Sequence, residues 1–338
     1  MILAGDIGGT KTNLALFTLE SGHWITPFEA TYPSQNYSGL ESLVDDFLKQ
    51  AQVHHRIEAA GFGVAGPVVG TRCVTTNLPW TITIPNLQKQ LECEKVFLIN
   101  DLEAMSASIP ILSQNELVSL NPNSSTQTGN VALIAAGTGL GEALLYWDGE
   151  QFRSVASEGG HADFAPRNDR QMGLWHYWQQ RLAYVSYESL LSGPGLLRIY
   201  QFLKEGGYGE EPAWLSQLLN QRNSSAVIAE TGLANENELC VQALEMFVAI
   251  YGAEAGNLAL KFKALGGVYL GGGIAPKILD KLRGGTFMQA FLDKGRFANF
   301  LASIPVYVIL NPKAGLLGAA QYVAQMGLDR PSLKQRKN

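Results

Sequence analysis

Cysteine is scarce in this chain of 338 residues, which contains only Cys73, Cys93 and Cys240. No two of them have the C-x-x-C spacing of a zinc or redox site, and three scattered residues make no disulfide framework. The sequence therefore predicts a protein without structural disulfides. A reducing cytoplasmic location is the simplest expectation.

Positive charge is also in short supply. Lysine and arginine number 25 against 30 aspartates and glutamates, which leaves a net charge of −5. A nucleic-acid interface needs clustered lysines and arginines. The one basic cluster, at positions 334–337, belongs to a terminal segment that we expect to be solvated. We therefore expect no nucleic acid among the partners.

Uninterrupted apolar runs of membrane-spanning length are missing. The longest apolar segment, around Val241 to Leu260, contains Glu245 and Glu254, which a membrane span rarely tolerates. A secretory signal needs a basic start and an apolar core, yet Asp6 follows Met1 after four residues. With 46% apolar and 16% charged residues, the chain is predicted to be an ordinary globular protein of about two domains, without a membrane segment.

The P-loop and dinucleotide-binding motifs are absent, but another glycine-rich turn lies near the amino terminus. Two apolar runs flank Gly8 and Gly9, and the second alternates with polar residues as a half-buried β-strand does. The tip of such a hairpin brings backbone N–H groups to a bulky anion, with Thr10 and Lys11 as further donors. Asp6 points to the same place, and a carboxylate beside phosphates requires a cation, so the pairing indicates phosphate with Mg²⁺. The alternative is a tight turn beside a solvated aspartate.

A second glycine loop, residues 137–141 with the sequence Gly-Thr-Gly-Leu-Gly, follows another apolar run. After each loop come a strand-like segment, a turn at 21–22 or 148–149, and a further strand-like segment. Repetition of such a unit implies two related domains, and two loops facing each other would hold a polyphosphate from both sides. We place the domain change near Pro110, ahead of the turn-rich connector 121–129.

The remaining segments of the first domain predict a mixed sheet with helices on its faces. A third strand is expected at 24–32, with Pro27 marking an edge or a bulge. An amphipathic helix is expected from Leu40, with Ser38 as its amino-terminal cap. A buried strand is expected from Ala59 onward.

In the second domain, helical spacing indicates a long helix between Leu239 and Ala255. The apolar run 268–270 predicts a strand that enters a triple-glycine turn. A further strand is expected at 305–310, and a closing helix at 314–326. Together these elements describe an α/β protein.

The apolar strand 96–99 ends at Asn100 and Asp101, and ligands of such sheets collect beyond the carboxyl ends of the strands. A carboxylate there can accept the proton of an attacking hydroxyl group, an effect typically worth about 10²–10⁴-fold in rate. Alignment and charge neutralisation lower most of the remaining barrier to phosphoryl transfer. We therefore predict that Asp101 is the catalytic base. The alternative is that the Asn-Asp pair caps a helix.

Glu158, His161 and Glu188 form a second polar cluster. Glu158 and His161 are three positions apart, and they share a face if the backbone turns. Carboxylates, an amide and an imidazole mix acceptors with donors, as a ring of hydroxyls requires. Such a site rejects analogues that lack a hydroxyl. A metal site and a solvated loop pair are the alternatives, and the metal is less favoured because no third soft ligand accompanies these residues.

Four motifs resemble those of the sugar-kinase branch of the hexokinase, actin and heat-shock chaperone superfamily. They are D-x-G-G-T at 6–10, the second glycine loop, E-G-G-H at 158–161 and L-S-G-P-G-L at 191–196. The last two match the zinc-free bacterial glucokinases letter for letter, and the similarity runs over nearly the whole chain. ROK-family sugar kinases hold zinc with a histidine of this region and a cysteine cluster, which this chain lacks. The resemblance therefore implies ATP and Mg²⁺, and no zinc.

The resemblance also implies a two-domain actin-like (ribonuclease H-like) α/β fold with duplicated mixed sheets, flanking helices and a cleft between the domains. The small domain would comprise 1–110, rejoined by the C-terminal helix 312–338, and the large domain 111–311. A homodimer is the family expectation. The implied reaction transfers the γ-phosphoryl group of ATP to the 6-hydroxyl of glucose. A kinase for another hexose or with polyphosphate as donor, and a non-catalytic sugar sensor, are the alternatives.

Residue roles follow from the resemblance by matching motif positions. The implied hexose-binding residues are Asn100, Asp101, Glu158, His161 and Glu188, with Asp101 as the base at the 6-hydroxyl. The implied nucleotide-binding residues are Gly5, Asp6, Ile7, Gly8, Gly9 and Thr10 in the first loop, Gly137, Thr138 and Gly139 in the second, and Gly271, Gly272 and Gly273 near the adenosine. Asp6 would orient Mg²⁺ through water. Family members commonly have Asn where this chain has Lys11, which leaves the side-chain contribution there open.

Overall fold

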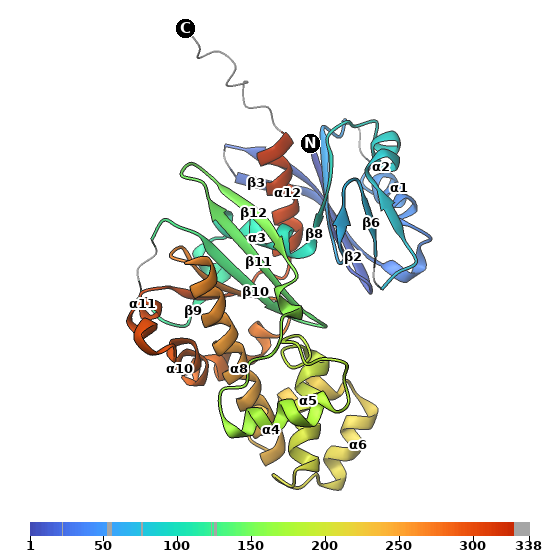
Figure 1. The fold of residues 1–338 in the computed structure, drawn as a ribbon. Coiled ribbons are helices and arrows are strands. Elements are labelled where there is room, and N and C mark those ends of the chain that lie inside the picture. The colour runs from blue at the N-terminus through green and yellow to red at the C-terminus, as the bar shows by residue number, and fades with distance from the viewer. Residues whose placement is uncertain (22, 53–55, 76, 123, 125–126, 328–338) are drawn as a thin grey trace. The chain divides into compact units, whose positions relative to one another are not determined.

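The structure is a computed structural model that describes residues 1–21, 23–52, 56–75, 77–122, 124 and 127–327. Predictions for Gly22, for positions 123, 125 and 126 of the connector and for the basic tail lie outside these residues. The chain folds into two compact units, each drawn in Figure 1. Unit 1 comprises Met1–Leu112 with Lys313–Asn338, and unit 2 comprises Ser113–Pro312.

Unit 1 is built on a five-stranded sheet in the order β3-β2-β1-β4-β8. Neighbouring strands are antiparallel from β3 to β1 and parallel from β1 to β8. The strands are β1 (Ile2–Ile7), β2 (Lys11–Glu20), β3 (His23–Pro33), β4 (Ala59–Val64) and β8 (Val96–Asn100). The register between β2 and β3 shifts from the Leu16–Phe28 pair to the Thr18–Ile25 pair. The extra residue lies in β3 beside Pro27, which confirms the predicted bulge on an edge strand.

Helices cover both faces of this sheet. They are α1 (Leu40–Gln50) and α2 (Ile84–Leu91) on one face, and α3 (Asp101–Ser108) and α12 (Ala314–Gly327) on the other. Leu3 and Leu14 face α1 and α2, whereas Ala4 and Ala15 face α12. The prediction of a half-buried second strand is therefore wrong for residues 14–17, because an apolar layer packs on each side of them.

Two further details of unit 1 differ from the sequence predictions. The N-cap of α1 is Gly39 rather than Ser38, and no side chain caps this helix. The polar excursion after β4 forms a small antiparallel sheet that was not predicted. Its strands are β5 (Val68–Val69), β6 (Arg72–Val74) and β7 (Thr81–Thr83). Strands of two or three residues are too short to show a hydrophobic period.

Unit 2 contains a six-stranded sheet in the order β12-β11-β10-β13-β14-β9. The strands are β9 (Leu117–Ser119), β10 (Val131–Ala136), β11 (Leu140–Trp147), β12 (Phe152–Ser157), β13 (Gly267–Gly271) and β14 (Val306–Ile309). Running from β12 to β14, neighbouring strands are antiparallel twice and then parallel twice, as from β3 to β8 in unit 1. The duplication predicted from the glycine loops is confirmed in strand order and direction.

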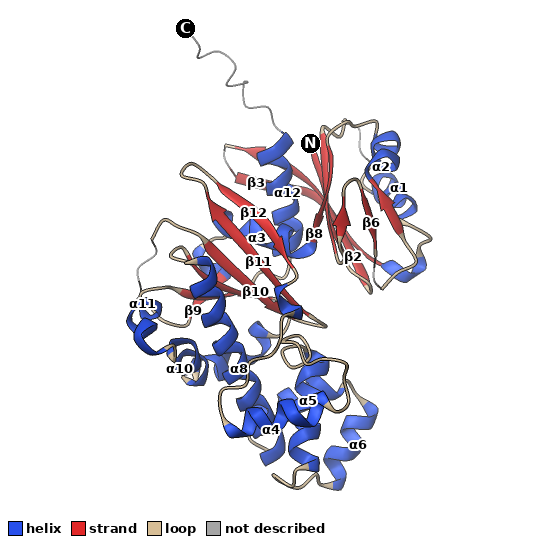
Figure 2. Cartoon of the chain, viewed as in Figure 1, coloured by secondary structure: helices blue, strands red, loops and turns tan. Residues whose placement is uncertain are grey.

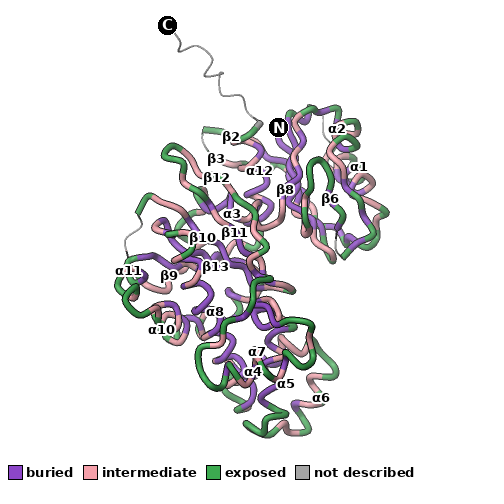
Figure 3. The backbone as a smooth tube through the Cα atoms, viewed as in Figure 1, coloured by how far each residue is buried: buried purple, intermediate pink, exposed green. Residues whose placement is uncertain are grey.

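Most helices of unit 2 are inserted between β12 and β13, and Figure 2 shows α4, α5 and α6 grouped beyond the strands of this unit. The helices are α4 (Asp169–Gln179), α5 (Gly193–Glu205), α6 (Ala213–Gln221), α7 (Ser224–Leu233), α8 (Glu238–Phe262), α9 (Leu279–Arg283), α10 (Thr286–Leu292) and α11 (Ala298–Ala302). The long helix α8 packs in the core of the unit, as the buried tube in Figure 3 shows. Within the described residues, α8 is the one helix long and apolar enough to span a membrane, and 78% of that stretch is buried.

Candidate functional site

The first glycine loop connects β1 to β2 as a tight turn. The Gly8 N–H donates to the Lys11 carbonyl at 3.1 Å, and the Ser34 hydroxyl donates to the Gly8 carbonyl at 2.7 Å. A Cβ on Gly9 would lie 2.7 Å from the Asn77 Cβ, so only glycine fits there. Thr10 and Lys11 are exposed at the tip, where their side chains are available to a ligand.

Asp6 is the penultimate residue of β1, beside this loop, and faces the first turn of α12. A Cβ on Gly315 would lie 3.6 Å from the Asp6 carboxyl carbon, which is ordinary van der Waals contact, so the carboxylate packs close to this helix turn. The Asn13 amide donates to Asp6 Oδ2 at 3.3 Å. Burial raises the pKa of Asp6, against the opposing effects of that hydrogen bond and the Lys11 charge. A bound cation at this carboxylate would offset the unfavourable burial of its charge.

Asn100 and Asp101 lie where β8 passes into α3. Asn100 is the N-cap of α3, and its side chain accepts the Leu102 N–H at 2.8 Å while Glu103 accepts the Asn100 N–H at 3.1 Å. The Asp101 carboxylate also accepts the Leu102 N–H, at 3.0 Å. The capping interpretation is therefore confirmed for Asn100, and a second role for the pair stays a prediction.

Strand order relates Asp101 to Asp6. Asp6 is opposite Gly63 of β4, and Val64, the next residue, is opposite Asn100 of β8. A Cβ on Gly63 would lie 3.6 Å from the Asp101 Cα, so Asp101 lies over the residue directly opposite Asp6. With one strand spacing of about 4.8 Å between β1 and β4, the Cα atoms of the two aspartates lie within about 10 Å of each other at the same edge of the sheet.

The second glycine loop lies between β10 and β11 and is bound to Glu188. Glu188 Oε2 accepts the Leu140 N–H at 2.9 Å, and a Cβ on Gly139 would lie 2.6 Å from the same oxygen. The Gly137 carbonyl accepts the Gly193 N–H at 2.8 Å, which ties the loop to the start of α5. Glu188, a predicted sugar-binding residue, is thus in direct contact with the predicted phosphate-binding loop 137–141 within unit 2.

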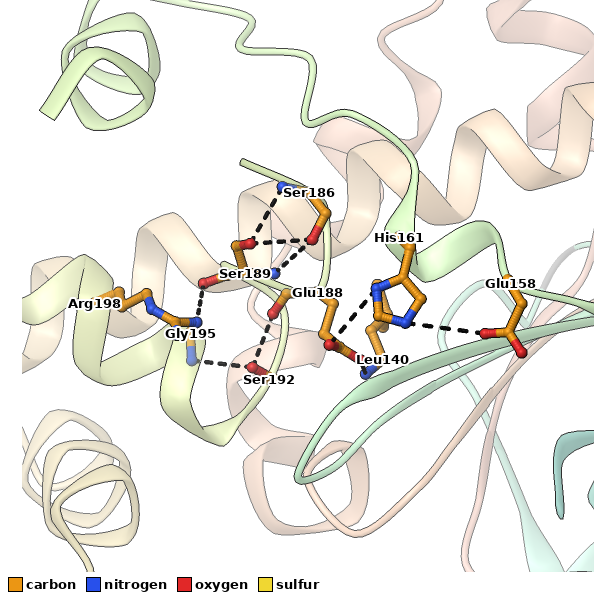
Figure 4. Close-up of polar contacts among 9 residues, drawn as sticks. All are labelled: Leu140, Glu158, His161, Ser186, Glu188, Ser189, Ser192, Gly195 and Arg198. Carbon is orange, nitrogen blue, oxygen red and sulfur yellow. Dashed lines mark hydrogen bonds and ion pairs between the residues drawn. The ribbon is translucent and has the colours of Figure 1, made fainter. Parts of the chain in front are cut away.

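Glu158 and His161 are brought together by a single 3₁₀ turn, Gly159–His161, as the spacing predicted. His161 lies between two carboxylates, with Nε2 3.9 Å from Glu158 Oε2 and Nδ1 3.8 Å from Glu188 Oε1. Figure 4 shows the imidazole between these acids and the edge of β11. All three side chains are partly or largely exposed, and together they offer acceptors and a donor to a polyol.

A pocket of about 330 Å³ adjoins this cluster within unit 2. Its lining combines the glycine loop, the polar cluster and the start of α5, and includes Thr138, His161, Ser186, Glu188, Ser192 and Arg198. Much of the polar wall of the pocket is already engaged. The Ser186 and Ser189 hydroxyls lie 3.0 Å apart, and the Ser192 hydroxyl caps α5 by accepting the Gly195 N–H at 3.0 Å.

Gly271, Gly272 and Gly273 lie at the carboxyl end of β13, next to the second glycine loop. The Ile274 N–H donates to the Ala136 carbonyl at 3.2 Å, one residue before that loop begins. Gly272 has a φ of +78° and leaves no room for a Cβ, which would approach the Ala136 carbonyl oxygen to 2.4 Å. This triple-glycine turn and residues 137–141 therefore form one edge of the sheet.

The structure places the predicted residues in two groups. Asp6, residues 8–10 and Asn100–Asp101 share one sheet edge of unit 1, and the polar cluster and the glycine turns 137–141 and 271–273 share one edge of unit 2. Gly5 and Ile7 lie within β1, where a Cβ on Gly5 would meet Phe62 at 2.6 Å and Ile7 is buried. Their contribution is to pack the strand. The prediction that the two loops grip one polyphosphate stays a prediction, because they belong to separate units.

Several supporting residues were missed from the sequence. Gly315, Asn13 and Ser34 hold Asp6 or the first loop, and a glycine in the first turn of a predicted helix was the available signal for Gly315. No group of three or more His, Cys, Asp or Glu side chains in the described part of the chain is placed to hold a metal ion. The three cysteines are buried and free.

Comparison with known proteins agrees with this architecture. A family model described as Glucokinase matches residues 3–326. A glucokinase from Synechocystis is 39% identical over 346 residues, covering 96% of this chain and 98% of the relative. The crystal structure of a glucokinase from an Antarctic psychrotroph has a TM-score of 0.83 and 28% identity, over 96% of this chain and 98% of its own. A ROK-family glucokinase from Streptomyces griseus, solved with glucose and AMPPNP, shares the fold at a TM-score of 0.65 and 23% identity over 96% of this chain and 99% of its own.

The duplicated sheets, their paired glycine loops and these neighbours define a sugar kinase with the two-domain actin-like fold. Within that class, the match over residues 3–326 and the identity to the relative over nearly its full length are specific. The chain belongs to the glucokinase family.

Proposed function

We propose that the protein transfers the γ-phosphoryl group of ATP to the 6-hydroxyl of glucose, with Asp101 as the general base. The observation that supports this most strongly is that Asp101 and Asp6 lie at one sheet edge, with Asp101 over Gly63, the residue opposite Asp6, and the two Cα atoms within about 10 Å of each other. One carboxylate serves the attacking hydroxyl and the other serves the charged donor. In the balanced reaction the sugar oxygen bonds to the γ-phosphorus, the bond to ADP breaks, and the hydroxyl proton passes to Asp101.

The base is needed because a sugar hydroxyl ionises far above neutral pH. Accepting its proton as the new bond forms typically contributes about 10²–10⁴-fold. Asp101 is held by its position at the first turn of α3, where its Oδ1 accepts the Leu102 N–H at 3.0 Å.

The hexose hydroxyls bind the polar cluster of unit 2 together with Asn100. Glu158 and Glu188 supply acceptors, and His161 between them supplies a donor or an acceptor according to its tautomer. Each hydroxyl of the correct sugar satisfies one of these groups. A sugar that lacks or inverts a hydroxyl leaves a group unpaired, which is the physical basis of the proposed selectivity.

The nucleotide phosphates bind the backbone of residues 8–10 and 137–139, and the triple-glycine turn 271–273 lies near the adenosine. Asp6 fits a role toward Mg²⁺, because it offers hard oxygen ligands and the Asn13 amide donates to it only at a long 3.3 Å. Mg²⁺ neutralises charge on the transferring phosphoryl group when it is bound. The chain's own donors align the phosphates, with the exposed Thr10 and Lys11 at the loop tip.

The experiment is a panel of sugars and donors. Glucose 6-phosphate formation is measured with ATP and Mg²⁺, and mannose, fructose and N-acetylglucosamine are run beside glucose. We expect glucose to give the highest kcat/KM, and ATP to exceed polyphosphate as donor. A higher kcat/KM for another sugar or for polyphosphate would assign the site to that substrate. Absence of phosphorylation of every sugar would refute the proposal.

A further inference from the structure

Glu142 is a buried carboxyl on the face of the unit 2 sheet that carries core residues. It lies on β11 opposite Ile134 of β10 and Ser157 of β12, and its side chain is 1% exposed. Ile134 and Leu140 on the same face belong to the hydrophobic core. Among the described residues, no hydrogen-bond partner reaches Glu142 Oε1. A buried polar atom without a partner is unfavourable, so its retention calls for a physical account.

The other oxygen of Glu142 lies directly against the sugar-binding turn. A Cβ built on Gly159 would lie 2.0 Å from Glu142 Oε2. Gly159 follows Glu158 and begins the 3₁₀ turn that ends at His161. Any movement of the Glu142 carboxyl toward the turn must therefore displace the backbone that carries Glu158 and His161, two predicted sugar-binding residues.

A polar network beneath Glu142 extends to Glu188, the third predicted sugar-binding residue of the polar cluster. Glu254 of α8 is wholly buried and pairs with Lys261 Nζ at 3.3 Å. The Asn257 amide donates to Glu254 Oε2 at 2.7 Å and to the Tyr187 hydroxyl at 3.1 Å. Tyr187 precedes Glu188, so the network supports both segments of the polar cluster.

The groups that face Glu142 favour its neutral form. Burial and, after it, the Glu254 carboxylate raise the pKa of Glu142 to about 8, against the opposing effect of Lys261. The Tyr251 hydroxyl of α8 is also close, and it donates to the Ile134 carbonyl at 3.3 Å instead of to Glu142. On the far side of Glu254, Lys294 donates to the Asn257 amide oxygen and to the Ala253 carbonyl. A charge on Glu142 would therefore lie against Gly159, while the nearby cation, Lys261, is already paired with Glu254.

We propose that Glu142 is a positioning residue for sugar binding, whose neutral carboxyl lets the Gly159–His161 turn pack on β11 and whose ionisation displaces that turn and weakens glucose binding. The inference rests on the proposed function. Glu142 touches no substrate in this account, and it acts through Glu158 and His161. Asp101, which belongs to unit 1, is unaffected, so the effect falls on KM for glucose rather than on kcat.

The test compares the pH dependence of KM for glucose between pH 7 and pH 9 in the wild type and in Glu142→Gln, with ADP formation as the readout. If only the neutral form binds, a pKa near 8 leaves about a tenth of the protein competent at pH 9, so KM rises about tenfold. The amide cannot ionise, and we expect its KM to change less than about twofold. Glu150→Gln makes the same change at an exposed site in the β11–β12 turn, and should follow the wild type.

Coincident pH profiles for the wild type and Glu142→Gln would overturn the inference, as would a rise confined to kcat. Circular dichroism at each pH checks that every variant is folded. If Glu142→Gln does not fold, Glu254→Gln serves instead. Loss of the Glu254 charge lowers the pKa of Glu142, so the rise in KM should begin at lower pH, and an unchanged onset would refute the proposal. A wild type that fails to phosphorylate glucose at pH 7 refutes the proposed function, a different outcome.

Discussion

The two units share one strand arrangement, and individual backbone hydrogen bonds in them correspond. In unit 1 the Ala65 N–H donates to the Ile7 carbonyl at 3.1 Å, and in unit 2 the Ile274 N–H donates to the Ala136 carbonyl at 3.2 Å. Each acceptor is the last residue of the central strand, and each donor follows the parallel neighbour of that strand. The glycine loops therefore start from equivalent backbone positions, and the units differ in the side chains placed around them.

Register identifies which side chains correspond. Asp6 of β1 corresponds to Ala135 of β10, since each is opposite the equivalent glycine of the next strand. Counted in the same register, Asp101 beyond β8 corresponds to Asn311 beyond β14. Neither alanine nor an amide can ligate a cation as a carboxylate or accept a proton as a base. Both carboxylates that we propose for phosphoryl transfer are thus in unit 1, and the inserted segment between β12 and β13 gives unit 2 the polar cluster that we propose for the sugar.

The largest effect is expected from substitution of Asp101, the first residue of α3. We expect Asp101→Asn to lower kcat for glucose phosphorylation by about 10²–10⁴-fold, because the amide cannot accept the hydroxyl proton. Asp169→Asn is a matched control in unit 2, since Asp169 also follows an asparagine N-cap, Asn168, at the first position of a helix. The control should retain its turnover. Equal losses in both variants would mean that Asp101 acts only as a helix-terminal charge.

Glu142 tests the comparison at a core position, because its counterpart on β2 is the buried Leu14. Because its pKa is raised to about 8, Glu142 keeps its proton up to about that pH in the folded protein, whereas an unfolded chain releases it near the ordinary glutamate pKa of 4.5. The free energy of unfolding of the wild type should therefore fall, relative to Glu142→Gln, as the pH rises between these values. We expect a relative change on the order of 2–4 kcal/mol between pH 5 and pH 8.

Urea titrations of the two proteins at several pH values give this difference. It should level off above about pH 8, where both states have lost the proton. A difference that does not vary with pH would mean that Glu142 has the same pKa in the folded and unfolded chain. Glu150→Gln, exposed in the same hairpin, should show no trend.

The arrangement of strands and helices and the polar residues of the candidate site could be predicted from the sequence, for identifiable reasons. Strand 131–136 is a continuous apolar run, and α8 carries apolar residues at helical spacing. The candidate residues Asn100, Asp101, Glu158, His161 and Glu188 lie beside glycines or strand ends, which are positions typical of a site. The duplication was visible because both loops keep their glycines. These signals are local in the chain, and local signals can be read without coordinates.

The missed features depend on contacts between distant segments. The binding of the second loop by Glu188 joins residues 48 positions apart, and the approach of Gly315 to Asp6 joins the two ends of unit 1. The Ser38 cap was wrong because Gly39 occupies the N-cap in an extended conformation that a serine could also adopt. Glu142 looked like an ordinary polar residue after a loop, and only packing shows that it is buried.

Substitutions at two glycines of the second loop distinguish a role in packing from a role in ligand binding. A methyl group on Gly139 meets the Glu188 carboxylate at 2.6 Å, so Gly139→Ala should destabilise the protein by about 1–3 kcal/mol and raise KM for glucose. A methyl group on Gly137 has no neighbour within 4 Å among the described residues. Gly137→Ala should leave the melting temperature unchanged and raise KM for ATP, because only a ligand is left for the methyl group to touch. Unchanged KM for ATP would remove Gly137 from the phosphate site.

The smallest effect concerns Lys11, an exposed residue at the tip of the first loop. If its ammonium group helps to bind the phosphates, Lys11→Asn raises KM for ATP. An exposed charge contact is worth about 0.2–1 kcal/mol, so the rise should not exceed about fivefold. Salt screens such a contact, and the ratio of the two KM values should approach one as KCl is raised toward 1 M, where the Debye length is about 3 Å. Lys49→Asn, at an exposed lysine of α1 near Asp46, provides the control for net charge. A Lys11→Asn effect that persists at high salt would mean that the Lys11 side chain binds the phosphates by a direct hydrogen bond. The loop of unit 1 would then depend on its side chains for phosphate binding, whereas the loop of unit 2 depends on its backbone.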